Sequence, residues 1–250
     1  MTMTERQERE RQYWNNHAQV REYADWQEFP YAEWRVYRPI ETMALDHLGT
    51  MTGKRLLVAG VGSSAILFAQ AGAEVWGFDI SEGQIAAVQA LVDRHDLSDR
   101  IHLKAMPFEA LEYPDSSFDL AFGDAILHHI DLPRGAAELA RVLRTGGRAS
   151  FIEPLGSNPL LQLARRHLPY RGKGRTEDER PLQYRDIRTF IKAFPKSQYR
   201  EFALVSMLGE RVVTDRSTIR RLQHLDEIIL RHAAWMRPLC QTVWIGIEAE

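Results

Sequence analysis

A glycine-rich turn and an aspartate downstream of it have the residue types and the spacing to bind a nucleoside. The apolar residues 56–59 (LLVA) run directly into the turn at residues 60–62 (GVG). Glycine permits a tight turn and lets the backbone come close to a ligand. A second apolar stretch, residues 75–78, ends in Asp79. A carboxylate at the tip of the next parallel strand can accept hydrogen bonds from both hydroxyls of a ribose.

Side chains able to move a proton follow two further apolar stretches, residues 118–122 and 148–152. The candidates at the ends of these stretches are Asp124, His128, His129 and Glu153. A carboxylate or an imidazole within hydrogen-bond reach of a substrate proton can act as a general base. Adjacent residues of a helix point in different directions, so we expect at most one of the two histidines to be catalytic.

With these residues in view, the chain resembles the class I S-adenosylmethionine-dependent methyltransferases, in particular the small-molecule enzymes of the methyltransferase-11 type. The resemblance covers residues 36–155. The features that carry it are the glycine turn, residues 79–81 (DIS), residues 114–119 (PDSSFD) leading to residues 127–129 (LHH), and residues 143–147 (LRTGG). It implies S-adenosylmethionine as cofactor and S-adenosylhomocysteine as product.

The resemblance also implies roles for individual residues. The expected cofactor contacts are Trp14, Ala59, Gly60, Gly62, Asp79, Ile80, Met106, Pro107, Phe108 and Asp124. Because Pro107 stands where the family often has an acidic residue, we expect the adenine to lie against the backbone and the side chains of Met106 and Phe108. The expected catalytic residues are His128, His129 and Glu153, and no metal is expected.

The reaction implied is methyl transfer to an oxygen or nitrogen of a small metabolite, in specialised natural-product biosynthesis. Methylation of a ring carbon is a close alternative. A nicotinamide-dependent oxidoreductase would require a second phosphate-binding feature and a hydride-transfer pair, neither of which we find in the sequence. A catalytically weak cofactor-binding relic is a further alternative, since Val58 and Ser64 replace an acidic residue and a glycine of the family pattern.

Alternation of strand-like and helix-like stretches predicts an α/β fold, a Rossmann-like and mostly parallel sheet with helices on both faces. The strands are expected at residues 55–59, 74–78, 101–104, 118–122, 148–152, 199–208 and 241–248. The resemblance implies that the last of these seven runs antiparallel between the fifth and the sixth. Residues 1–250 are expected to form a single methyltransferase domain.

Two segments outside this sheet are expected to cover the site. Residues 4–47 contain eight aromatic side chains, and their Tyr13-Trp14-x-x-His17 pattern resembles the lid helices of related methyltransferases. The insertion at residues 154–186 follows the fifth strand, at the edge where open α/β sheets bind ligands, and is expected to cap the substrate. The expected substrate contacts are Tyr13, His17, Arg166, Tyr170, Arg175 and Tyr184. Inward-facing arginines would select an anionic acceptor.

Composition limits the partners of the chain. A formal net charge of −2 gives no general attraction for nucleic acid. Cys240 is the single cysteine, so no internal disulfide can form. The charged N-terminal residues do not resemble a signal peptide, and no apolar run is long enough for a membrane span. We therefore expect a cytoplasmic protein without nucleic-acid or membrane partners, either a monomer or a homodimer.

Overall fold

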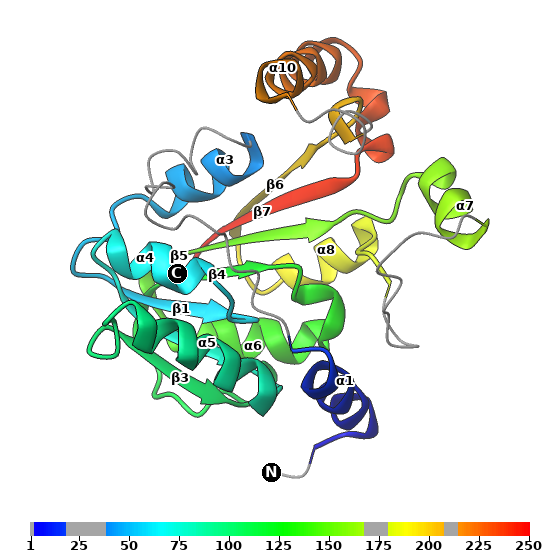
Figure 1. Cartoon of the computed structure of the whole chain (residues 1–250). Coiled ribbons are helices and arrows are strands. Elements are labelled where there is room, and N and C mark those ends of the chain that lie inside the picture. Colours follow the sequence, from blue (N-terminus) through cyan, green and yellow to red (C-terminus); the bar gives the residue numbers. More distant parts are fainter. Residues whose placement is uncertain (1–2, 19–38, 168–179, 208–214) are drawn as a thin grey trace.

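The computed structural model describes residues 3–18, 39–167, 180–207 and 215–250 (Figure 1), excluding the side chains of residues 164–167 and Arg216. The described residues form one sheet in the order β3-β2-β1-β4-β5-β7-β6. Its strands are β1 (Arg55–Ala59), β2 (Glu74–Asp79), β3 (Ile101–Ala105), β4 (Phe118–Asp124), β5 (Leu143–Pro154), β6 (Lys196–Phe202) and β7 (Thr242–Glu248). Among these strands β7 alone runs in the opposite direction to the others, and it lies between β5 and β6. The expected fold is confirmed, including the position of the last strand.

The central strands are apolar on both faces, as parallel strands covered by helices must be. Residues 56–59 of β1 are all buried. Its last residue, Ala59, lies opposite Phe78 of β2 and Gly123 of β4. The carboxyl ends of β1, β2 and β4 therefore meet at one edge of the sheet, which is where ligands bind in open α/β folds.

Helices cover both faces of the sheet (Figure 1). On one face lie α3 (Pro39–Leu48), α4 (Ser64–Gln70) and α5 (Glu82–Arg94), whose apolar side chains share one buried cluster. On the other face, α6 (Leu132–Val142) and α8 (Tyr184–Ile191) belong to a second buried cluster. Helix α1 (Glu5–Asn16) lies across the carboxyl edge of the strands. Within the region expected to be a lid, α1 therefore covers the strand ends, whereas α3 packs in the core.

The sixth strand differs from the prediction. It was expected at residues 199–208 but spans Lys196–Phe202. Ala203 has a left-handed backbone conformation (φ 62°). The backbone N–H groups of the next three residues, Leu204 to Ser206, then donate to the carboxylate of Asp226 in α10 (Arg216–His232). The strand ends early because a carboxylate distant in the sequence captures these donors.

The fifth strand also differs, since it was expected at residues 148–152 but begins at Leu143 and includes the glycines at residues 146 and 147. Gly146 has φ +74°, and its N–H donates to the carbonyl oxygen of Ala249 at 2.8 Å. The register between β4 and β5 shifts between Phe118 and Leu120. The glycines therefore form an irregular start of the strand, which continues from Leu143 to Pro154.

Beyond β5, α7 (Pro159–His167) extends away from the sheet, and η2 (Ala234–Leu239) precedes β7 (Figure 1). Part of the expected substrate cap, residues 168–179, lies outside the described residues. No helix in the described part of the chain combines the length and the apolar character needed to cross a membrane.

Candidate active site

A cavity of about 380 Å³ lies between the carboxyl ends of β1, β2 and β4 and the helix α1. Ten of the residues that the sequence singles out line it: Trp14, His17, Gly60, Gly62, Asp79, Ile80, Met106, Phe108, Asp124 and His129. Ala59 is buried at the end of β1, and Pro107 lies between two lining residues. Glu153, His128, Tyr13 and Tyr184 do not line this cavity.

The glycine turn forms one wall of the cavity. Gly60 has φ +65°, a conformation that favours glycine, and a Cβ there would lie 3.2 Å from Cδ1 of Ile126. A Cβ on Gly62 would meet no protein atom within 4 Å, so this position faces open space. Nε2 of Gln84 donates to the carbonyl oxygen of Val61 at 3.0 Å and holds the turn in place. The turn thus presents backbone to the cavity with little side-chain bulk.

Asp79 ends β2 and reaches the cavity from the neighbouring strand. Its Oδ1 accepts a hydrogen bond from the backbone N–H of Ser81 at 2.9 Å, which sets the orientation of the carboxylate. Burial raises the pKa of Asp79 to about 6, while the N–H of Ser81 and the charge of His129 act in the opposite direction. The carboxylate is ionised at neutral pH and can accept hydrogen bonds from a bound hydroxyl group.

Apolar side chains after β3 and a polar one after β4 complete the walls. Met106 and Phe108 are buried, and the ring of Phe108 packs edge-on against Phe78 at 5.4 Å between centroids. Asp124 is the last residue of β4, and Ala125 after it takes a left-handed conformation (φ 55°). This turn directs the chain into η1 (Leu127–His129). The lining of the cavity therefore combines the apolar side chains of Met106 and Phe108 with the carboxylate of Asp124.

Helix α1 closes the cavity with a buried polar cluster. Glu10 is 3% exposed, and its Oε2 accepts a hydrogen bond from Nε1 of Trp14 at 3.1 Å. The same oxygen lies 3.2 Å from Nδ1 of His129, at an angle outside hydrogen-bond geometry, so this contact is a charge interaction when His129 is protonated. The ring of Trp14 meets that of His129 edge-on at 5.6 Å between centroids.

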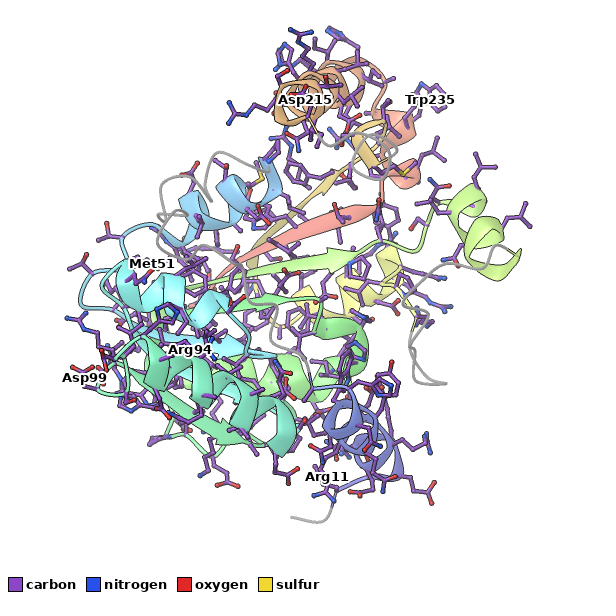
Figure 2. All side chains as sticks on the ribbon, viewed as in Figure 1. Arg11, Met51, Arg94, Asp99, Asp215 and Trp235 are labelled. Atoms are coloured by element: carbon purple, nitrogen blue, oxygen red, sulfur yellow. The ribbon has the colours of Figure 1, made fainter. Side chains whose placement is uncertain are left out.

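Hydrogen bonds and an ion pair hold helix α1 against the loop that follows β2. Oδ1 of Asn15 accepts hydrogen bonds from Oγ of Ser81 at 2.7 Å and from the N–H of Gly83 at 3.0 Å. Arg11 lies 3.2 Å from Glu82 and projects from α1 in Figure 2. The carboxylate and amide that perform these tasks, Glu10 and Asn15, were missed in the sequence. They stand in a polar helix where no apolar or strand-end pattern marks them.

His128 and Glu153 form a buried pair beside the cavity. Oε1 of Glu153 accepts hydrogen bonds from the backbone N–H groups of Ile126 at 2.8 Å and Leu127 at 2.7 Å. Its Oε2 lies 2.7 Å from Nδ1 of His128. Glu153 thus holds η1 and orients the imidazole. The two histidines differ in placement, because His129 borders the cavity under α1 and His128 borders a neighbouring cavity.

The residues expected to contact the substrate are dispersed. Tyr13 stacks on His17 with ring centroids 4.3 Å apart, and of these two only His17 lines the cavity under α1. The hydroxyl of Tyr184 donates to Oε1 of Glu201 at 2.8 Å. The side chain of Arg166, and Tyr170 and Arg175 as a whole, lie outside the described residues.

Residues 57–151 match the family described as Methyltransf_11, a methyltransferase domain. The matched segment runs from β1 to β5 and includes the glycine turn, Asp79, Asp124 and both histidines. Residues 57–151 therefore carry a methyltransferase domain, and the strand order with the antiparallel β7 is that of the class I S-adenosylmethionine-dependent methyltransferase fold.

Named proteins extend the comparison. The chain is 39% identical over 80 residues to a ubiquinone/menaquinone biosynthesis C-methyltransferase of Geobacter sulfurreducens, covering 31% of this chain and 30% of that protein. It is 28% identical over 200 residues to an O-methyltransferase of Aspergillus sclerotiorum, covering 70% and 75%. The structure of geranyl diphosphate C-methyltransferase from Streptomyces coelicolor superimposes over 100% of both chains, with a TM-score of 0.64 and 15% identity. The last likeness shows the fold alone.

The alignments differ in how much of each relative they include. The chain spans 30% of the bacterial C-methyltransferase and 52% of a demethylmenaquinone methyltransferase of Bacteroides fragilis. The chain therefore spans between about a third and about half of the length of these two relatives.

Proposed function

We propose that this protein transfers the methyl group of S-adenosylmethionine to an oxygen or nitrogen of a small metabolite in specialised biosynthesis. The observation that carries the proposal is the cavity under α1, where the glycine turn, Asp79 and Asp124 come together from three neighbouring strands. A protein in this role is expected in the cytoplasm, as a single domain. Residues 4–47 would be its lid and residues 154–186 its substrate cap.

The cavity suits an adenosyl group. The open space at Gly62 admits a ligand against the backbone, and the apolar slot of Ile80, Met106 and Phe108 suits a flat base. Asp79 would accept hydrogen bonds from the ribose hydroxyls. The other proposed cofactor contacts are Trp14, Ala59, Gly60, Pro107 and Asp124.

When bound, S-adenosylmethionine supplies an electrophilic methyl group that an acceptor can attack in line. The protein's part in such a displacement is mainly to hold the acceptor in place and to exclude water. Glu10, Trp14 and His129 close the cavity from the side of α1. His17 would contact the acceptor from the same helix end. The remaining proposed substrate contacts are Tyr13, Arg166, Tyr170, Arg175 and Tyr184.

An acceptor hydroxyl must also lose its proton, and we assign this step to His128. The carboxylate of Glu153 at Nδ1 fixes the orientation of the ring. Glu153 would act as a positioning residue, since its oxygens bind Ile126, Leu127 and His128. His129 is the alternative base, because it borders the cavity under α1.

Oxygen is favoured over carbon as the accepting atom. The relative that aligns over 70% of this chain is named an O-methyltransferase, whereas the bacterial C-methyltransferase aligns over 31%. Methylation of a ring carbon would need a similar base and is the second candidate.

Calorimetric titration of the protein with S-adenosylmethionine and S-adenosylhomocysteine tests the proposal. We expect saturable binding of both, and release of S-adenosylhomocysteine when a panel of hydroxylated metabolites is offered as acceptor. Absence of heat and of any thermal stabilisation at millimolar ligand would contradict the proposed function and favour a relic that no longer binds the cofactor.

A further inference from the structure

A second cavity of about 240 Å³ lies beside the first, and Ile130 borders both. We call it the Arg6 cavity, after the residue of α1 at its rim. His128 of η1 and Arg180 and Asp186 near the start of α8 also line it. The rest of its lining is apolar: Leu127, Ile130, Leu132 and Leu182. The backbone N–H of Leu182 donates to the carbonyl oxygen of Pro154 at 3.0 Å, so the cavity lies at the carboxyl end of β5.

The other charged side chains around the Arg6 cavity have partners within the protein. The guanidinium of Arg180 forms two hydrogen bonds with the carboxylate of Asp186, at 2.6 and 2.9 Å. Glu153 is committed to His128 and to the backbone of η1. The Arg180–Asp186 pair is bidentate and contributes no net charge to the cavity.

Arg6 is different. Its Nε is shielded from solvent and has no hydrogen-bond acceptor, and the guanidinium forms no ion pair with any residue that the structure describes. Arg6 nevertheless lines the cavity. An anionic group of a ligand bound there would give the guanidinium the partner that it lacks among the described residues. A single guanidinium that has no carboxylate partner suits one carboxylate on the ligand.

We propose that the Arg6 cavity receives the methyl acceptor, and that the acceptor is a small hydroxylated monocarboxylate with an apolar body. Its carboxylate pairs with Arg6, its apolar part packs against Leu127, Leu132 and Leu182, and its hydroxyl faces His128. In the reaction, the hydroxyl oxygen forms a bond to the methyl carbon, the carbon–sulfur bond breaks to leave a neutral thioether, and His128 takes the proton. This inference rests on the proposed function and adds the charge of the substrate to it.

The test compares matched probes that differ in charge. The whole protein, saturated with S-adenosylhomocysteine, is titrated with 4-hydroxybenzoate, with its neutral amide 4-hydroxybenzamide, and with 4-hydroxyphenyl phosphate. We expect the carboxylate to bind about tenfold to a hundredfold more tightly than the amide, the range given by a charge-assisted hydrogen bond. The phosphate ester, with a second negative charge, should bind less tightly than the carboxylate.

Variants assign the preference to Arg6. Arg6→Gln should bind the acid and the amide equally, and Arg6→Lys should retain part of the preference, since it keeps the charge but loses the planar fork. Arg100→Gln is the matched control. Arg100 is exposed and directly precedes β3, so it lies at the amino ends of the parallel strands, whereas the Arg6 cavity lies at the carboxyl end of β5. This control variant should behave as the wild type. Unchanged affinity for S-adenosylhomocysteine shows that each variant is folded.

The outcomes separate this inference from the proposed function. If S-adenosylhomocysteine does not bind the wild type, the proposed function fails. If it binds but the acid and the amide bind equally, or neither binds at millimolar concentration, the inference alone is overturned. Retention of the preference in Arg6→Gln, or tighter binding of the phosphate ester, would also overturn it.

Discussion

The raised pKa of Asp79 predicts that this residue destabilises the empty protein while it strengthens cofactor binding. Burial raises the pKa of Asp79 from 3.8 to about 6. A carboxyl that holds its proton more tightly in the folded state stabilises the fold below the unfolded pKa, and this contribution is lost as the pH rises through 6. The rise corresponds to about 3 kcal/mol as an upper limit, since the side chain is only partly buried.

Asp79→Asn removes the charge and keeps the shape. The amide oxygen can still accept the hydrogen bond from the N–H of Ser81. Without cofactor, we expect the variant to be more stable than the wild type by about 1 to 3 kcal/mol at pH 8, and by less than about 1 kcal/mol near pH 4. In the presence of cofactor, we expect the substitution to be unfavourable instead. Two ribose hydroxyls lose a charged acceptor, so binding should weaken by about 1 to 3 kcal/mol.

Urea unfolding of the cofactor-free protein between pH 4 and 8 measures the first effect, and calorimetric titration with S-adenosylhomocysteine measures the second. Asp99→Asn is the control, because Asp99 is exposed and lies far from α1 (Figure 2). It should change neither quantity. A variant that is less stable than the wild type at pH 8, or that binds S-adenosylhomocysteine with unchanged affinity, would refute the reasoning.

Three further substitutions probe other contacts. Glu153→Gln should lower kcat about tenfold to a hundredfold with little change in KM, since the orientation of His128 depends on the carboxylate. In steady-state assays, a proportional rise in KM would count against this role. Asn15→Ala should weaken S-adenosylhomocysteine binding about five- to thirtyfold, because three hydrogen bonds that hold α1 are lost. The exposed Asn16→Ala should not weaken it. Asp226→Ala should lower the free energy of unfolding in urea by about 2 to 4 kcal/mol, because three backbone N–H groups lose their acceptor. A loss below about 0.5 kcal/mol would show that these groups find other partners.

Local patterns in the sequence determined the cofactor half of this protein. The glycine turn follows a strand whose residues 56–59 are buried, and Asp79 follows the next strand. Such signals are read within one strand–turn–helix unit, because turn geometry and apolar periodicity act between near neighbours. The order of the strands followed from the resemblance that these motifs carry.

Contacts between residues distant in the sequence determined the features of the site and of the sheet that were not predicted. Glu10 and Asn15 stand in a polar helix, and only its docking on the strand ends gives them their partners at His129 and Ser81. The end of β6 depends in the same way on Asp226. Burial and pairing of polar groups depend on what another part of the chain places beside them, and no local pattern encodes that. Tertiary structure alone therefore decided how α1 closes the site, and how the two histidines divide between the neighbouring cavities.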